Sequence, residues 1–400
     1  MATDPCALVI LDHMPLAAEF FEVYWNQKPF LVRNAIGKAD FEPLISAEEL
    51  AGLSLEDAPQ SRLMKTPQRG QEGGQKGGEG WSCEFGPFSQ QDFTACEDHN
   101  WSLLVQNVEQ FHPDTATLLR HFDFSPRWLM DDIMVSYSEP GGSVGPHIDN
   151  YHVFLVQGQG RRQWTVGRAP IVQEQYIEDL DFKILKEPIE GDAVEVGQGD
   201  VLYLPPRFGH QGTTIERSMT FSVGFLGPKV SELMSGYGQY LADNEAQDQR
   251  YVGAGLGTQS SGFKIDQKAV ERLRDCLAQR LESPDFSKWL VAFFTESSHD
   301  NFGNLEDRDD AINVETLGQT LADGARLIKP QYVKFAITAA SPGQFNVGFD
   351  AHSFILQEPL FPLLQAFMKE RSVGIERIQT AQALKLVVNL FNHHALEFED

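Results

Sequence analysis

The middle of the chain has the apolar pattern of short, closely spaced β-strands. Between Met134 and Phe225, runs rich in Val, Ile, Phe and Tyr alternate with Gly, Pro and Asp. The clearest of these runs are IMVSYS, VFLVQ, RRQWTV, VLYLP and TFSVGF. Several short strands separated by turn residues are typical of an antiparallel sandwich or barrel. We therefore predict an all-β core for this part of the chain.

The pattern becomes helical after Gly227-Pro228. The apolar residues Val270, Leu273, Leu277 and Leu281 recur at helical spacing and predict one helix stripe. The acidic stretch 301–310 is expected to be a linker. The remainder predicts helices and a small hairpin, in a compact α+β domain of winged-helix type. The predicted elements of this domain are a helix at Val314–Leu321, strands at Tyr332–Thr338 and Phe345–Phe349, and a last helix carrying Leu384, Val387, Val388 and Phe391.

Two segments in the first part of the chain stand apart from the β-rich core. Ala17–Trp25 has apolar positions compatible with a helix. Pro67–Gly80 reads PQRGQEGGQKGGEG and has almost no apolar residue that could be buried. We predict a flexible surface loop there, with a role as a lid left open.

Composition and charge narrow the class of protein. The 400 residues are 42% hydrophobic, which suits a globular chain of more than one domain. There is neither a signal-peptide pattern nor an apolar run near the ~18 residues of a membrane span, so we expect a cytoplasmic protein with no membrane contact. The formal net charge of −25 opposes nucleic-acid binding and permits a basic protein partner. Such acidity also suits a plain solubility role.

The first candidate for chemistry is a His-x-Asp pair at the start of a predicted strand. The segment Gly141–Asp149 reads GGSVGPHID, so His147 and Asp149 would point to the same face. A neutral imidazole and a carboxylate together suit a divalent first-row metal. A hydrogen-bonded His/Asp couple is the ordinary alternative for an isolated pair.

A second histidine completes a metal-binding pattern. Gly199–His210 reads GDVLYLPPRFGH, which predicts a turn, a strand, a rigid Pro-Pro corner and then His210. His147, Asp149 and His210 would form a two-histidine, one-carboxylate triad, which leaves positions open on Fe(II). The alternative is that His210 only caps a loop beside the prolines.

A buried arginine is expected on the strand that follows. Arg162 shares a strand face with Trp164 and Val166, whose apolar character marks that face as inward. An inward guanidinium requires a partner, and the far carboxylate of 2-oxoglutarate fits its planar fork. An internal Asp or Glu is the alternative partner. Small hydroxyls on nearby strands are candidates to complete the carboxylate pocket, namely Ser136, Ser138 and Thr220.

The other histidines lack partners in the sequence. His152 alternates away from the triad face, so we expect it on the outer surface of its strand.

These motifs resemble one family in particular. DDIMVSYSEPGGSVGPHIDNYHVFLVQGQGRRQWTVG, GDVLYLPPRFGHQG and MTFSVGF are similar to the bacterial JmjC-type ribosomal oxygenases, and so are YWNQKPFLVRNA and NWSLLVQNVEQFHPDTATLLRHF upstream. The resemblance covers residues 18 to 228 approximately. In that family's pattern the metal ligands fall on His147, Asp149 and His210. The carboxylate-binding arginine falls on Arg162, and its hydroxyl partners match Ser136 and Thr220, although Thr220 stands where a serine is expected.

The resemblance implies an α+β protein with a double-stranded β-helix core of the cupin/JmjC jelly-roll type. It implies a JmjC/cupin catalytic domain at 1–228, a helical dimerisation region at 229–305 and a winged-helix-like domain at 306–400. The implied cofactor is Fe(II), with 2-oxoglutarate as co-substrate. The implied substrate is an arginine, at Cβ, of a basic large-subunit ribosomal protein, and the expected assembly is a homodimer without nucleic acid. A histidyl hydroxylase, a non-catalytic metal-binding cupin scaffold and a transcription factor using the last domain remain alternatives.

Overall fold

The chain forms two compact units, Met1–Gly227 and Pro228–Asp400. The computed structural model describes residues 8–67, 80–178, 180, 182–244, 249–253, 256, 262–296 and 311–399. Most of the Gly-rich stretch 67–80, the expected linker 301–310 and the expected boundary at 305/306 therefore lie outside the described residues. The division into three domains stays a prediction. No described helix combines the length and apolar character needed to cross a membrane.

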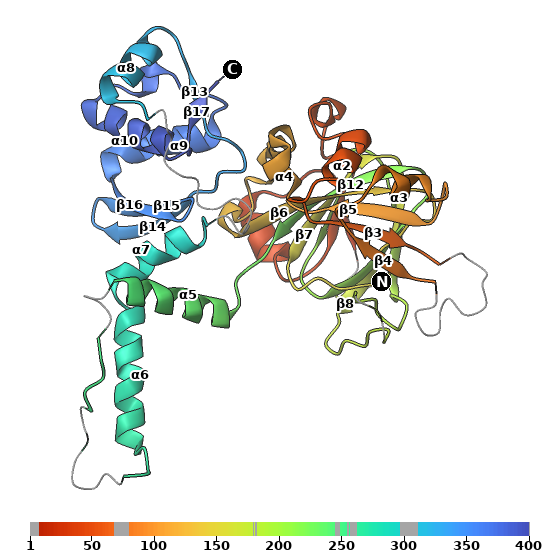
Figure 1. Cartoon of the computed structure of the whole chain (residues 1–400), viewed down its shortest axis with the longest axis horizontal. Coiled ribbons are helices and arrows are strands. Elements are labelled where there is room, and N and C mark those ends of the chain that lie inside the picture. Colours follow the sequence, from red (N-terminus) through yellow and green to blue (C-terminus); the bar gives the residue numbers. More distant parts are fainter. Residues whose placement is uncertain are drawn as a thin grey trace. The chain divides into compact units, whose positions relative to one another are not determined.

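The first unit is built on a large sheet that is antiparallel except for its first strand pair (Figure 1). Its strands, in spatial order, are β1 (Val9–Leu11), β2 (Phe30–Val32), β10 (Val201–Leu204), β7 (His152–Gln159), β12 (Ser218–Phe225), β6 (Met130–Ser138), β5 (Trp101–Val105), β3 (Ser61–Lys65) and β4 (Ser82–Phe85). A smaller sheet contains β11 (Phe208–Thr214), β8 (Arg162–Pro170) and β9 (Gly191–Val196). The strands predicted from the five apolar runs are confirmed as β6, β7, β8, β10 and β12.

The two sheets face each other across one apolar core. Val153 and Leu155 on β7 pack in the same buried cluster as Trp164 and Val166 on β8. Because side chains alternate along a strand, these residues define the inner face of each sheet. The result is the double-stranded β-helix, closed at its interior by side chains from both sheets.

Aromatic residues cover the outer face of the large sheet. Phe20, in the π-helical turn η1 (Phe20–Tyr24), contacts Phe30, Phe154 and Tyr203 edge to face or tilted. The predicted helix at Ala17–Trp25 is therefore confirmed as α1 (Ala17–Glu19) continued by η1, and it lies against the sheet. The other helical segments of this unit are η2 (Lys38–Phe41), α2 (Ala47–Leu53), α3 (Gln90–Thr94), α4 (Val108–Phe111), η3 (Pro113–Phe122) and η4 (Arg127–Leu129).

The second unit contains helices and small sheets. Its helices are α5 (Val230–Asp243), α6 (Gln267–Leu281), α7 (Pro284–Phe293), α8 (Val314–Ala322), α9 (Phe361–Lys369) and α10 (Ala381–Asn392), with the short turns η5 (Glu358–Leu360) and η6 (Ile375–Arg377). Its strands are β14 (Ala336–Ser341), β15 (Gln344–Phe349) and β16 (His352–Gln357) in one sheet, and β13 (Leu327–Ile328) paired with β17 (Glu397–Phe398). Residues of α8, α9, α10 and β15 share one buried core.

Most predicted elements of the second unit are confirmed, and one strand is displaced. The helix at Val314–Leu321, the last helix and the strand at Phe345–Phe349 correspond to α8, α10 and β15. The strand expected at Tyr332–Thr338 begins later, at Ala336. Pro330 starts a turn that is closed by the Val333 N–H, so the residues before Ala336 are not extended. The winged-helix comparison stays a prediction.

Candidate active site

The His-x-Asp pair lies in the segment that enters β7, and the second histidine lies within β11. The two histidines are paired through their backbones: the His147 N–H donates to the His210 carbonyl at 3.1 Å, and the reverse bond is 2.9 Å. This single bridge joins the entrance of the large sheet to the small sheet. It brings residues more than sixty positions apart to adjacent places at the mouth of the barrel.

The three side chains converge as a set of metal ligands. One ligand atom from each of His147, Asp149 and His210 lies within 4.8 Å of the others, and this is the set of three that the described residues provide. His210 Nε2 is 3.5 Å from an Asp149 carboxylate oxygen, and the two imidazole centroids are 4.2 Å apart. Two imidazoles and one carboxylate match the facial arrangement of non-haem Fe(II) sites.

Backbone carbonyls orient both imidazoles. His147 Nδ1 lies 2.9 Å from the Gly145 carbonyl, and His210 Nδ1 lies 3.0 Å from the Phe208 carbonyl. Each carbonyl accepts a hydrogen bond from Nδ1–H, which leaves the unprotonated Nε2 free to coordinate a metal. The same bonds would stiffen the rings in the position that coordination requires.

His210 is held in the neutral form. Burial, followed by the proximity of His147, lowers its pKa to about 4, while Asp149 and the Phe208 carbonyl act in the opposite direction. The neutral imidazole is the form that coordinates a metal ion. His210 therefore does not have to lose a proton before it coordinates a divalent metal at neutral pH.

Arg162 is a buried cation inside the barrel, as predicted from its strand face. Arg162 is 3% exposed, and its guanidinium carbon lies 5.3 Å from the centroid of the Trp164 ring. Burial lowers its pKa to about 10, so it stays charged at neutral pH. The described residues provide it with no carboxylate, and its Nε has no hydrogen-bond partner. Arg162 therefore does not form the internal ion pair that was the alternative, and its guanidinium is available for an anionic ligand.

Two hydroxyls contact the guanidinium directly. Thr220 Oγ1 and Ser138 Oγ each accept a hydrogen bond from Arg162 at 3.2 Å. The predicted Ser136 is buried beside Thr220, and its hydroxyl lies 3.5 Å from the Thr220 carbonyl rather than on the arginine. Ser138 lies two residues further along the same face of β6, so period-two alternation identifies both serines but does not choose between them.

A second layer of polar groups was not predicted. Ser138 donates to the buried Ser102 on β5 at 2.7 Å, and Thr220 donates to the Gln157 side chain on β7 at 3.2 Å. Because the Gln157 side-chain oxygen accepts the hydrogen bond from Thr220, the lone pairs of that hydroxyl are left for Arg162. Gln157 is on the inward face of β7, and that is the sequence signal that could have identified it.

His152 lies on the outer face of its strand, as predicted, but it is buried there and not exposed to solvent. Its ring stacks on Trp25 with centroids 3.4 Å apart, and Tyr203 places its hydroxyl 2.8 Å from Nδ1. Burial lowers the pKa of His152 to about 3. The segment that includes Trp25 packs over this face of the sheet and buries His152. Alternation along one strand predicts which face a residue is on, but not whether another segment covers that face.

Acidic side chains lie near Tyr151, two residues after the metal-ligand candidate Asp149. An Asp132 carboxylate oxygen and the Tyr151 ring lie 3.2 and 3.6 Å from the position that a Cβ would take on Gly224. Burial, Glu109 and Asp131 raise the pKa of Asp132 well above its usual value. A cationic group bound near this carboxylate would relieve that repulsion.

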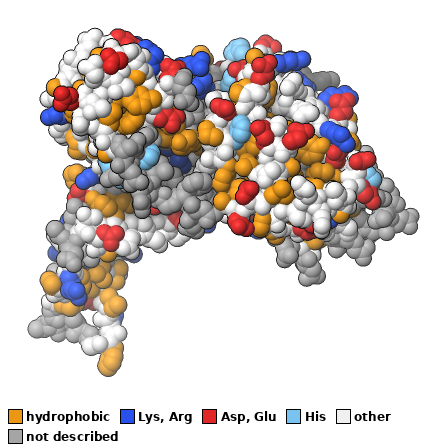
Figure 2. All heavy atoms as spheres, turned by 45° about the horizontal axis from the view of Figure 1, so that its top comes forward, with side chains coloured by type: hydrophobic (Ala, Val, Ile, Leu, Met, Phe, Trp, Pro, Cys, Tyr) orange, Lys and Arg blue, Asp and Glu red, His pale blue; other side chains and the backbone are white. Residues whose placement is uncertain are grey.

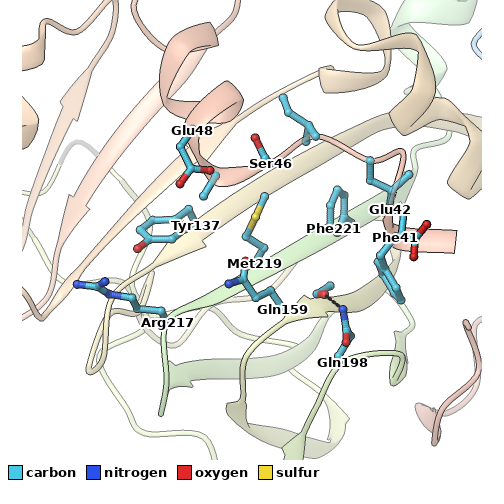
Figure 3. Close-up of a pocket in the computed structure, with 14 residues that line it drawn as sticks. Phe41, Glu42, Ser46, Glu48, Tyr137, Gln159, Gln198, Arg217, Met219 and Phe221 are labelled. Atoms are coloured by element: carbon cyan, nitrogen blue, oxygen red, sulfur yellow. Dashed lines mark hydrogen bonds between the residues drawn. The ribbon is translucent and has the colours of Figure 1, made fainter. Parts of the chain in front are cut away.

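A separate cavity of about 440 Å³ lies on the other face of the large sheet (Figure 3). Tyr137, Met219 and Phe221 form its floor, and each alternates with an inward residue of the barrel such as Ser136, Ser138 or Thr220. Arg217 at its rim is paired with Glu139. The metal-ligand triad is therefore not in this cavity but on the opposite side of the sheet.

Comparisons with known proteins agree with this geometry. Residues 117–233 match the JmjC domain family. The chain is 35% identical over 284 residues to the ribosomal protein uL16 3-hydroxylase of Escherichia coli, an alignment that covers 70% of this chain and 72% of that protein. It is 37% identical over 220 residues to a probable ribosomal oxygenase of Haemophilus influenzae, covering 54% of this chain and 51% of that protein.

The solved structures extend the similarity to nearly the whole chain. The ribosomal oxygenase YcfD of Escherichia coli in complex with cobalt and 2-oxoglutarate aligns with a TM-score of 0.77 and 28% identity. That alignment covers 96% of this chain and 98% of the YcfD chain.

Proposed function

The chain belongs to the bacterial JmjC-type ribosomal oxygenases and is a 2-oxoglutarate-dependent dioxygenase, and we propose that it hydroxylates Cβ of an arginine in a basic large-subunit ribosomal protein. The observation that carries the proposal is the pairing of a His/Asp/His triad with a buried, uncompensated arginine in one barrel. The relatives' names supply the protein substrate, a ribosomal protein. The arginine is our inference.

We assign Fe(II) to His147, Asp149 and His210. Both imidazoles present Nε2, and Asp149 contributes one carboxylate oxygen. Three protein ligands leave the remaining positions of the ion for the co-substrate and oxygen. The burial of His210 limits access of water to the site from the small sheet.

We assign the far carboxylate of 2-oxoglutarate to Arg162. A carboxylate can accept two parallel hydrogen bonds from the guanidinium, and it would satisfy the Nε that lacks a partner. Ser138 and Thr220 hold the guanidinium from the side of the large sheet, and Ser136 adds a hydroxyl on the same face. These residues orient the co-substrate toward the triad.

The chain's own contribution to the reaction is binding and orientation. When bound, Fe(II) and 2-oxoglutarate supply the oxidation: one atom of O2 enters a substrate C–H bond as hydroxyl, the other enters succinate, and CO2 leaves. Trp164 and Val166 line the interior between Arg162 and the triad and exclude water there. The protein must also hold the substrate Cβ beside the metal, since position decides which C–H bond reacts.

The acidic group at the mouth supports an arginine rather than a neutral histidine as the target. Burial, followed by Asp149, Asp132 and Asp131, raises the pKa of the Tyr151 hydroxyl, and Arg62 acts in the opposite direction. A guanidinium is always charged and would be attracted to this group, whereas a histidine is mostly neutral at pH 7. The substrate side chain would therefore add positive charge beside Asp131 and Asp132, where Arg62 is the cation that the protein supplies.

We also propose a cytoplasmic homodimer that does not bind nucleic acid directly. On α6 the side chains of Leu273, Leu277 and Leu281 are 38%, 58% and 43% exposed and lie on one side of the helix. A second copy of the chain would cover this stripe. The net charge of −25 opposes binding to a phosphate backbone.

A peptide panel tests the choice of residue. Purified protein with Fe(II) and 2-oxoglutarate is given fragments of the ribosomal protein that carry arginine, histidine or lysine at the target position. We expect a gain of about 16 Da, one oxygen atom, on the arginine fragment with matching succinate. Modification of the histidine fragment instead would favour a histidyl hydroxylase, and absence of succinate with every fragment would favour a non-catalytic scaffold.

A further inference from the structure

Arg207 has a backbone conformation that is unusual for its residue type. Its φ is 68°, in the left-handed region, where glycine is the ordinary residue. It lies between the Pro205-Pro206 corner and β11, three residues before His210. A residue with a Cβ is strained in this conformation, so other contacts must hold it there.

The Arg207 side chain supplies those contacts. A guanidinium has five N–H groups, and five hydrogen bonds lead from this one. The acceptors are the Ile171 carbonyl (twice), the Val172 carbonyl, the Glu174 carboxylate at 2.7 Å and the Asn150 side chain at 3.3 Å. Four of these bonds reach one stretch of chain, Ile171–Tyr176, which follows β8.

The Arg207 backbone contacts a metal-ligand residue. Its N–H donates to the Asp149 carbonyl at 2.6 Å, and its carbonyl accepts from the Ile171 N–H at 2.9 Å. The residue therefore joins three segments: the one that carries Asp149, the one that leads to His210, and Ile171–Tyr176. Glu174 is fixed in turn, because its other oxygen accepts from the Tyr176 hydroxyl at 2.7 Å.

Ile171–Tyr176 also presses on the residue before His210. A Cβ built on Gly209 would lie 2.6 Å from the end of the Ile189 side chain and 2.8 Å from the end of the Ile171 side chain, so both isoleucines pack closely against this position. The pairing between β8 and β11 shifts between Phe208 and His210, which places Gly209 in a bulge. Ile171 is therefore one of two side chains that pack against the bulge before His210.

We propose that Arg207 is a positioning residue of the metal centre. It fixes Asp149 relative to His210 by tying both ligand segments to Ile171–Tyr176, and it does so through its guanidinium rather than by its charge alone. The inference rests on the proposed metal site. It assigns Arg207 no contact with metal, co-substrate or substrate.

Cobalt binding to purified variants tests the assignment. Arg207→Ala removes the guanidinium, and Arg207→Gly removes it while accepting the positive φ, so the second variant preserves the turn if the first fails to fold. We expect the Co(II) dissociation constant of both to rise about tenfold, the range seen when groups behind metal ligands are removed. The visible spectrum at saturating Co(II) should also shift, because it reports the geometry of the ligands.

Arg161→Ala is the matched control. Arg161 is also an arginine with carboxylate partners, Glu195 and Glu216, but it is about half exposed and has no contact with either ligand segment. It should bind Co(II) with the wild-type constant and spectrum. Wild-type Co(II) binding by Arg207→Gly, or an equal loss in Arg161→Ala, would overturn the inference. Failure of the wild-type protein to bind Co(II) would instead overturn the proposed metal site and the inference with it.

Discussion

At the scale of single residues, the contacts of Arg162 distinguish a ligand-binding role from that of a structural ion pair, because the described residues give it no carboxylate partner. A buried charge without a counter-ion destabilises a folded protein, because the desolvation of that charge is not repaid. Ser138 and Thr220 give it hydrogen bonds but no negative charge. The free protein therefore bears a cost that is recovered when a carboxylate binds.

The first prediction follows from that cost. Arg162→Met should leave the unfolding temperature of the metal-free, 2-oxoglutarate-free protein unchanged or higher. It should also weaken 2-oxoglutarate binding at least about 30-fold, since loss of one partner of a buried charged pair costs roughly 2–5 kcal/mol. Thermal unfolding with and without the co-substrate measures both effects, and Arg161→Met is the control. A variant that is destabilised yet keeps the 2-oxoglutarate-induced rise would show that Arg162 is structural.

His152 predicts a pH dependence of stability. Its pKa is about 3 in the folded protein, against an ordinary value of 6.5, so below pH 6.5 the unfolded chain binds more protons than the folded one. The stability that its neutral form contributes is complete above pH 6.5 and is lost as the pH falls towards 3, by at most about 1.4 kcal/mol per pH unit. Denaturant unfolding between pH 7 and 4 should therefore give a shallower pH slope for His152→Gln than for wild type. Parallel slopes would contradict this account.

The sequence alone identified the metal triad because its two halves are local. His147-Ile148-Asp149 is one motif, and the Pro205-Pro206 corner makes the turn toward His210 recognisable. Arg207 was not identified, because its role depends on Ile171 and Glu174, more than thirty residues away. Contacts of that kind become visible only when the strands are assembled.

At the scale of elements, strands with continuous apolar runs were predictable and polar strands were not. β7 and β12 are buried on both faces, and their apolar residues, VFLV in β7 and Met, Phe, Val and Phe in β12, make each segment recognisable as a buried strand. β11 reads FGHQGTT and β9 reads GDAVEV, so neither shows an apolar run although both belong to the small sheet. β11 carries His210. The position of this strand in the small sheet follows from its pairing with β8 and from the backbone bridge between His210 and His147, and not from an apolar run in its sequence.

Helix α6 predicts the assembly state. Leu277, the most exposed leucine of its stripe, should lie in a contact between copies of the chain. Leu277→Lys should therefore convert a dimer to a monomer in analytical ultracentrifugation. Gln279 lies two residues further on, about 200° around the helix and so almost directly opposite Leu277, and Gln279→Lys, which adds the same charge there, should remain dimeric. A wild-type monomer, or a dimeric Leu277→Lys protein, would contradict the role of α6.

At the scale of the whole molecule, the charge of −25 is the feature that bears on the partner. Acidic side chains are scattered over the face shown in Figure 2 rather than gathered in one patch. A dispersed negative field attracts a basic protein from a distance without fixing how it docks. The acidic residues beside Tyr151 then act at short range.

The long-range attraction should depend on salt. The kcat/KM for a full-length basic ribosomal protein should fall several-fold between 50 and 300 mM NaCl, because a larger ionic strength screens the attraction that speeds encounter. kcat should change little, and a short neutral peptide with the same target should show a weaker dependence. Equal salt dependence for the two substrates would mean that the net charge serves solubility alone.

The most direct test of the central claim is the mass of the ribosomal protein in cells. Large-subunit protein uL16 would be compared by mass spectrometry in cells with the gene, without it, and with the gene carrying His210→Ala. We expect a population heavier by about 16 Da, located on one arginine at Cβ, that disappears without the gene and returns with the wild-type gene but not with His210→Ala. An unchanged heavier population in the cells that lack the gene would contradict the account.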